Sequence, residues 1–87
     1  MSKVLVLGKG AREHIISINL LKSEYVSEVY VYPGNDGMIK DNIKLIDIEL
    51  FSEDFKYFLI NNKIELVVPG DESYLVNGIS DYLKELN

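Results

Sequence analysis

Residues 4–7, Val-Leu-Val-Leu, form an uninterrupted aliphatic run that ends at Gly8. A strand with one face in water would alternate apolar and polar residues, and this run has no polar position. It therefore predicts a strand buried on both faces, as in a parallel sheet covered by helices. Because parallel strands need a crossover between them, usually a helix, the run also constrains the arrangement of the remaining chain.

A helix is predicted directly after this strand. From Arg12 onward, apolar residues recur largely at helical spacing, so one side of the helix can face the sheet. These residues are Ile15, Ile16, Ile18, Leu20 and Leu21. The helix should end near residues 22–24.

Three later segments have strand patterns. Residues 28–32 are rich in β-formers and stop at a Pro-Gly-Asn-Asp-Gly cluster. Residues 43–48 mix apolar and polar positions, which predicts a short, partly exposed edge strand. Residues 64–68 predict another buried strand, halted by Pro-Gly-Asp-Glu-Ser.

Two more helices complete the pattern. Ser52 is expected to cap a helix with acidic residues in its first turn, where the helix dipole favours them. The inward face of that helix should consist of Phe55, Phe58, Leu59 and Ile60. A last helix is expected over residues 75–86.

This order, β-α-β-β-α-β-α, predicts a Rossmann-like α/β fold with right-handed crossovers and strand order 3-2-1-4. Three loops follow the strands that end at Leu7, Tyr32 and Val68: the first loop (8–10), the second loop (33–37) and the third loop (69–73). Ligands of open α/β sheets bind at the carboxyl edge, where these loops should gather.

Composition narrows the class of protein. The 87 residues suffice for one domain, and a net charge of −5 argues against a sequence-independent grip on nucleic acid. Without cysteine there is no disulfide or thiolate nucleophile, and zinc would depend on His14 and carboxylates. The first apolar run is too short for a signal peptide or membrane span, so we expect a cytoplasmic protein without membrane partners.

The first loop has the features of an anion site. Gly8 and Gly10 permit a tight turn and a close approach of backbone N–H groups to a ligand. The helix that follows adds unpaired amides and a positive dipole end, and Lys9 and Arg12 add charge. The turn predicts phosphate binding, with a purely structural βα turn as the alternative.

A dinucleotide site is disfavoured. Its fingerprint requires a small residue at the third glycine position and an acid at the end of the second strand. Glu13 fills the first position here, and Tyr32-Pro33 fills the second. Nicotinamide or flavin binding is therefore not expected.

Three motifs in order resemble the N-terminal domain of the phosphoribosylamine-glycine ligases. They are G-K-G-A-R-E-H at residues 8–14, P-G-N-D-G at 33–37, and I-E-L-V-V-P-G-D-E-S-Y-L-V-N-G at 64–78. The resemblance implies an ATP-grasp ligase of purine synthesis that joins glycine to 5-phosphoribosylamine through glycyl phosphate. Such enzymes use ATP with Mg²⁺.

For this chain, the resemblance implies that residues 1–87 are a truncated pre-ATP-grasp domain that helps bind phosphoribosylamine or glycinamide ribonucleotide. ATP and Mg²⁺ would be bound by the ATP-grasp domains, which lie outside this sequence and would be its partners. No cofactor, metal or catalytic residue is expected in the chain itself. The expected substrate-binding residues are Gly8, Gly10, Arg12, Glu13, His14, Pro33, Gly34, Asn35, Gly37, Gly70 and Glu72.

Two departures from the family pattern affect these expectations. The family usually reads G-G-R-E-H where this chain has Ala11, which would be strained at a positive φ. It usually reads V-G-P-E where this chain has Pro69-Gly70-Asp71-Glu72. Asp71 adds a negative charge beside the expected phosphosugar site.

Simpler roles exist for several of these residues. His14 could serve only local hydrogen bonding, and Glu13 could only favour the helix start. Asn35 and Gly37 could be needed for turn geometry, since Asn tolerates a left-handed backbone. The alternative function is a stand-alone Rossmann-like module that binds a nucleotide or sugar phosphate without catalysis.

Overall fold

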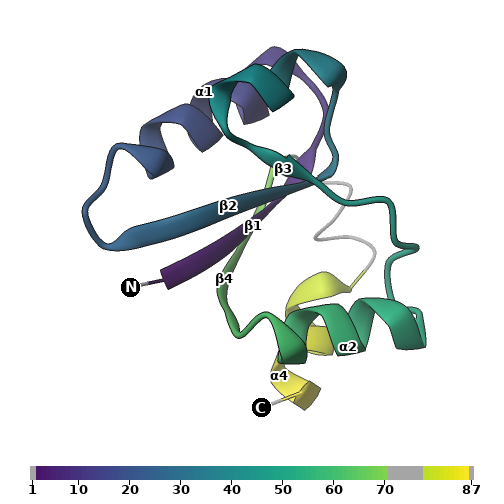
Figure 1. Ribbon diagram of the computed structural model, residues 1–87. Helices are drawn as coiled ribbons and strands as arrows, with labels where there is room; N and C mark the ends of the chain where they lie inside the picture. Colours follow the sequence, from purple (N-terminus) through teal and green to yellow (C-terminus); the bar gives the residue numbers. More distant parts are fainter. Residues whose placement is uncertain (1, 71–77, 87) are drawn as a thin grey trace.

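One parallel sheet organises the molecule. The computed structural model describes residues 2–70 and 78–86. Its strands are β1 (Ser2–Gly8), β2 (Val26–Pro33), β3 (Lys44–Leu45) and β4 (Ile64–Pro69), in the order β3-β2-β1-β4 (Figure 1). The predicted α/β class and strand order are confirmed.

Helices cover both faces of this sheet. They are α1 (Ala11–Leu21), the 3₁₀ helix η1 (Asp36–Asp41), α2 (Glu53–Asn61) and α4 (Ile79–Leu86). In Figure 1, α1 and η1 lie on one side of the sheet, and α2 and α4 lie on the other. Residues 71–77 lie outside the described residues, so the predicted start of the last helix at residue 75 is untested.

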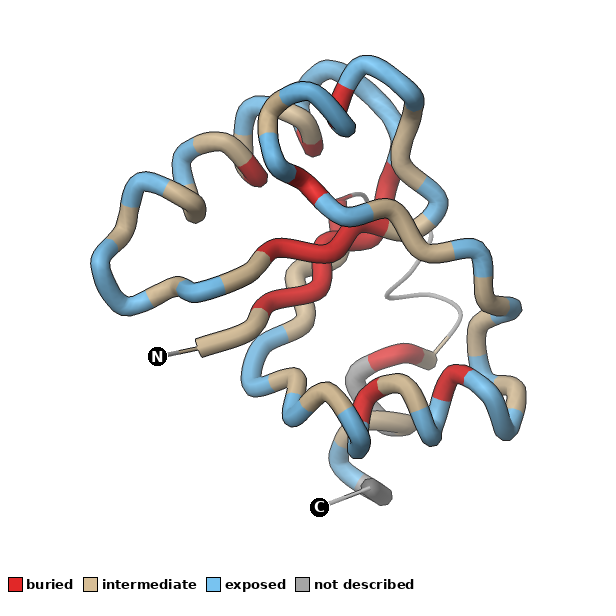
Figure 2. Tube along the Cα trace, viewed as in Figure 1, coloured by how far each residue is buried: buried red, intermediate tan, exposed pale blue. Residues whose placement is uncertain are grey.

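The central strand β1 separates two apolar clusters. Val4 and Val6 pack on the α1 side with Met38 of η1, while Leu5 and Leu7 pack on the other side with Phe55 of α2. Residues 4–7 are at most 1% exposed, and Figure 2 shows this buried band in red at the centre of the sheet. Burial on both faces is confirmed.

The face of helix α1 that packs against the sheet carries both polar and apolar residues. Glu13 and Ser17 are buried, and Ile16 and Leu20 pack against the core on the same side. Ile15 was expected to face inward, but it is 59% exposed. At about 100° per residue, Ile15 is turned about 200° from Glu13 and so lies on the outer surface.

Helix α2 begins as the sequence predicts. The Ser52 hydroxyl accepts a 3.1 Å hydrogen bond from the amide of Phe55, which satisfies one free donor of the first turn. Phe55 and Leu59 are buried, but Ile60 is 53% exposed and its predicted inward position is wrong. The inner face is already filled by residues at helical spacing, so Ile60 projects outward.

The segment around β3 departs most from expectation. Only Lys44–Leu45 pair as a strand, instead of residues 43–48, and the amide of Ile46 makes the last bond to β2, donating to the Val31 carbonyl at 3.0 Å. Ile46, Ile48 and Leu50 then pack against the cluster on the α2 side. Their apolar side chains therefore contribute to the core on the α2 side instead of forming a longer strand.

Candidate functional site

Backbone hydrogen bonds bring the three loops together at the carboxyl edge. The amide of Gly34 in the second loop donates to the Gly8 carbonyl at 2.9 Å. The amide of Gly70 in the third loop donates to the Leu7 carbonyl at 2.7 Å. The predicted gathering of the loops is confirmed for the residues that the structure describes.

The second loop is also tied to the first through a side chain. Asn35 Nδ2 donates a 2.7 Å hydrogen bond to the carbonyl oxygen of Lys9. Asn35 itself has an extended backbone (φ −146°, ψ 163°), so the left-handed conformation considered for it is wrong. The preceding Gly34 has φ +68°, and a Cβ there would collide with Leu45, so this turn requires glycine.

The start of α1 offers uncapped amides. Gly10 is the N-cap and provides no side chain, and the first helical bond runs from the His14 amide to the Gly10 carbonyl at 3.1 Å. Among the described residues, none accepts a hydrogen bond from the amides of residues 11–13. Donors of this kind, at the positive end of a helix dipole, suit an anion.

Ala11 causes no strain at this helix start. Among the described residues, the non-glycine positions with positive φ are Asn42, Phe51 and Lys63. Ala11 therefore opens α1 with an ordinary backbone. The departure from the family pattern at this position has no conformational cost.

Glu13 is enclosed by glycines from two loops. Its residue is 7% exposed, although carboxylates are rarely buried. A Cβ at Gly8 would lie 2.6 Å from Glu13 Oε1, and one at Gly70 would lie 2.5 Å from the same atom. The Glu13 side chain thus fills a space that both glycines leave open. It therefore has a packing role in addition to any effect on the start of the helix.

His14 makes a tertiary contact that the sequence analysis missed. Its Nε2 lies 2.7 Å from Oδ2 of Asp41, the last residue of η1 and 27 positions away. The His14 side chain is 23% exposed and that of Asp41 is 39% exposed. The expected local hydrogen bonding is therefore replaced by a bond between α1 and η1.

The remaining predicted residues divide into three groups. Lys9, Arg12 and Pro33 are exposed at the site, and neither cation joins an ion pair among the described residues. Gly37 lies beside the pair just described, since a Cβ there would be 4.0 Å from His14 Cε1. Asp71 and Glu72 of the third loop lie outside the described residues.

A second charged cluster lies toward the amino ends of the strands. Glu28 accepts hydrogen bonds from Lys44 Nζ at 2.6 Å and from the Tyr30 hydroxyl at 2.8 Å, and Lys3 Nζ lies 3.5 Å away. The Lys44 hydrogen bond, followed by that of Tyr30, lowers the pKa of Glu28 to about 2. These contacts join three strands and lie apart from the loops.

The described part of the chain lacks two further features, a metal-binding cluster and a membrane-spanning helix. No group of His, Asp and Glu side chains there is arranged to hold a metal ion. None of the described helices is long and apolar enough to cross a membrane.

Comparisons with known proteins agree with these features. The family described as "Phosphoribosylglycinamide synthetase, N domain" matches residues 2–87. The chain is 44% identical over 80 residues to a phosphoribosylamine–glycine ligase of Lactococcus lactis, covering 91% of this chain and 19% of that protein. It is 46% identical over 86 residues to one of Listeria monocytogenes, covering 94% and 20%.

A yeast protein shows the same match. The bifunctional purine biosynthetic protein ADE5,7 of Saccharomyces cerevisiae is 40% identical over 86 residues, covering 92% of this chain and 11% of that protein. The chain spans about a fifth of the length of the bacterial ligases it matches. With the family pattern running from residue 2 to residue 87, the chain belongs to the phosphoribosylglycinamide synthetase N-domain family.

Proposed function

We propose that this chain is the N-terminal substrate-binding domain of a phosphoribosylamine-glycine ligase and that its loops bind the phosphoribosyl substrate. Membership of the family supports the assignment, as do relatives of that name at 42–46% identity. In this proposal the chain holds phosphoribosylamine, or the product glycinamide ribonucleotide, and orients its amino group. The proposal includes a cytoplasmic location.

The observation that carries the proposal is the joining of the loops around the start of α1. The amides of residues 11–13, which have no acceptor among the described residues, provide donors for the substrate's 5-phosphate, and the exposed Arg12 adds a cation beside them. The Gly34–Gly8 and Gly70–Leu7 hydrogen bonds set the other two loops beside those donors. By the resemblance, Glu72 in the third loop would accept hydrogen bonds from the ribose hydroxyls.

In this proposal, the residues of this chain do not bind ATP or Mg²⁺. The ATP-grasp domains of the complete ligase would bind both and would supply the activated glycine. The residues of this chain would hold the phosphoribosyl group still while its amine reacts. Such positioning lowers the entropic cost of the bond-forming step without a catalytic side chain.

Isothermal titration of the 87-residue chain with glycinamide ribonucleotide tests the proposal. We expect saturable binding that weakens as salt is raised, because a phosphate contact is electrostatic. Arg12→Ala should weaken it about fivefold or more, in line with loss of a charge-assisted hydrogen bond. Lys56→Ala is the matched control, since Lys56 is an exposed cation on α2, across the sheet.

Two results would contradict the proposal. Tighter binding of AMP or NAD than of glycinamide ribonucleotide would favour a nucleotide module or a dinucleotide site. Equal losses in the Arg12 and Lys56 variants would show that the ligand does not sit at the first loop.

A further inference from the structure

The bond between His14 and Asp41 connects the helix that opens the phosphate site with the end of η1. We propose that Asp41 is a positioning residue of the phosphoribosyl site: it fixes the orientation and tautomer of His14, so that Nδ1 is the ring nitrogen left for the ligand. This inference rests on the proposed function. It adds a residue that lies outside all three loops.

The imidazole of His14 is held by one hydrogen bond and lies near η1. His14 lies in the first turn of α1, directly after the uncapped amides, and its Nε2 is held 2.7 Å from Asp41 Oδ2. Gly37 of η1 lies near the ring, since a Cβ added there would be at van der Waals distance, 4.0 Å, from Cε1. The ring therefore lies between α1 and η1, at the same edge of the sheet as the loops.

The chemistry of the partner decides which nitrogen carries the proton. An ionised carboxylate can only accept, so His14 Nε2 must donate to Asp41. In the neutral ring Nδ1 is then an acceptor, which suits a ribose hydroxyl or an amine. When the ring is protonated, Nδ1 becomes a donor, which suits a phosphate oxygen.

Charge alone predicts the opposite effect of removing Asp41. A carboxylate close to an anion site repels the anion, so its loss should tighten phosphate binding. A positioning role predicts weaker binding, because the freed imidazole would sample other orientations and both tautomers. The sign of the change therefore separates the two explanations.

The chain contains a single histidine, so its imidazole NMR signals report on His14 without ambiguity. Long-range ¹H–¹⁵N spectra should show the Nε2–H tautomer in the unmodified chain and a mixture of tautomers in Asp41→Ala. Ribose 5-phosphate is the probe for binding. Its addition should shift the imidazole signals of the unmodified chain.

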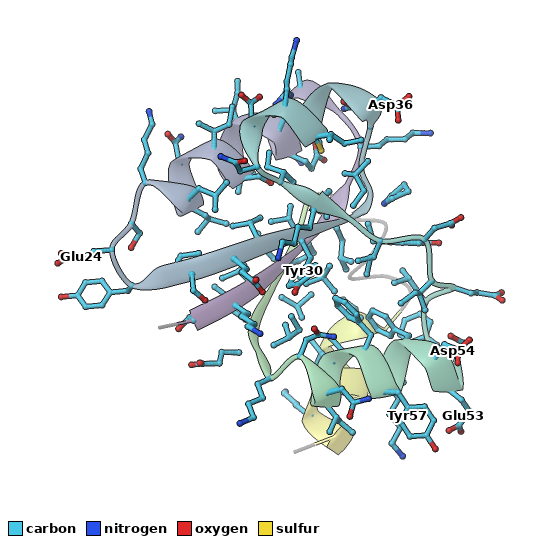
Figure 3. All side chains as sticks on the ribbon, viewed as in Figure 1. Glu24, Tyr30, Asp36, Glu53, Asp54 and Tyr57 are labelled. Atoms are coloured by element: carbon cyan, nitrogen blue, oxygen red, sulfur yellow. The ribbon has the colours of Figure 1, made fainter. Side chains whose placement is uncertain are left out.

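Affinities for ribose 5-phosphate complete the test. We expect Asp41→Ala to weaken binding about fivefold or more and Asp41→Asn to weaken it less, since the amide oxygen still accepts from Nε2. His14→Ala should cost at least as much as Asp41→Ala, and the double variant should cost no more than His14→Ala. Asp54→Asn is the control, and Figure 3 shows Asp54 on α2 and Asp36, the first residue of η1, on opposite sides of the sheet.

The outcomes are distinguishable. No binding of ribose 5-phosphate or glycinamide ribonucleotide by the unmodified chain would overturn the proposed function and this role with it. Binding that tightens in Asp41→Ala, or that Asp41→Ala weakens equally in the His14→Ala background, would overturn only the role of Asp41. Thermal unfolding identifies a misfolded variant, and Asp41→Asn, which keeps the shape of the side chain, then decides the question.

Discussion

The side-chain amide of Asn35 donates a 2.7 Å hydrogen bond to the backbone carbonyl of Lys9, which connects the second loop to the first. The sequence suggests that Asn35 contacts the ligand, yet its Nδ2 is already engaged by the protein. Asn35 therefore shapes the first loop with one N–H of its amide, which leaves the second N–H and Oδ1 for other hydrogen bonds. The loop conformation is the property that depends on this residue.

Asn35→Ala should destabilise the fold modestly. Loss of the bond to Lys9 is expected to lower the free energy of unfolding by about 1 kcal/mol, the usual net value of one hydrogen bond. Urea denaturation followed by circular dichroism measures this change. Asn19→Ala, on the exposed side of α1, is the control and should cost nothing, so equal losses would show that the bond contributes no stability.

Gly8→Ala should be rescued in part by removal of Glu13. A Cβ at Gly8 meets three atoms of the Glu13 side chain, so overpacking is expected to cost about 1–3 kcal/mol in the unmodified background. Glu13→Ala removes these three atoms, while the backbone strain at φ +149° remains. A double-mutant cycle measured by denaturation should therefore show coupling of about 1 kcal/mol or more.

Gly70→Ala provides the comparison for that cycle. A Cβ at Gly70 would collide with the Leu7 carbonyl as well as with Glu13, and the backbone atom cannot be removed. Glu13→Ala should consequently rescue Gly70→Ala less than it rescues Gly8→Ala. Equal rescue at both positions would contradict the described packing.

Ser52→Ala should weaken the start of α2. The Ser52 hydroxyl accepts from the Phe55 amide, and loss of such a cap costs about 1 kcal/mol. Ser52→Asp keeps an acceptor at the same position and should retain most of the stability. Thermal denaturation of both variants tests this, and similar losses would contradict a capping role.

Glu28 should give the protein a pH dependence at low pH. Its pKa is lowered to about 2 in the folded chain, first by the Lys44 hydrogen bond and then by that of Tyr30. A lowered folded pKa contributes stability that is present above the unfolded value of about 4.3 and is lost as pH falls through the folded value. The stabilisation should therefore disappear between about pH 5 and pH 2.

Glu28→Gln tests this dependence. Denaturation midpoints between neutral and acidic pH should fall less steeply for Glu28→Gln than for the unmodified chain. Glu24→Gln is the control, because Glu24 is an exposed carboxylate without an ion pair among the described residues. Identical pH profiles for all three proteins would show that the cluster does not stabilise the fold.

The sheet could be predicted because its signals are local. β1 and β2 end at a glycine or proline after apolar residues, and the turn after β1 leads directly into α1. The prediction that residues 64–68 form a buried strand is wrong about burial: no residue of β4 is buried, and Leu66 is 51% exposed, because β4 pairs with β1 alone among the described strands. The length of β3 could not be predicted, since Ile46 and Ile48 have the spacing of a strand but pack beneath the sheet edge. Ile15 and Ile60 likewise look like core residues and are exposed because other side chains fill the inner faces.

The site was predicted as a set of loops but not in its internal contacts. Nothing near Asp41 in the sequence marks it as the partner of a histidine 27 positions earlier. The burial of Glu13 had one available signal, the glycines at positions 8 and 70, whose missing side chains leave room for it. The burial of Glu13 can be inferred from these glycines only when it is known that the first and third loops are in contact.

The position of β1 between β2 and β4 has a consequence for binding energetics. The first loop leaves a strand that is hydrogen-bonded on both sides, so the backbone that leads into α1 is pre-organised before a ligand arrives. Gly70 follows β4, which pairs with β1 alone in the described sheet. In the proposed phosphoribosyl site, contacts made at this turn would therefore cost little ordering entropy, and affinity should depend mostly on them.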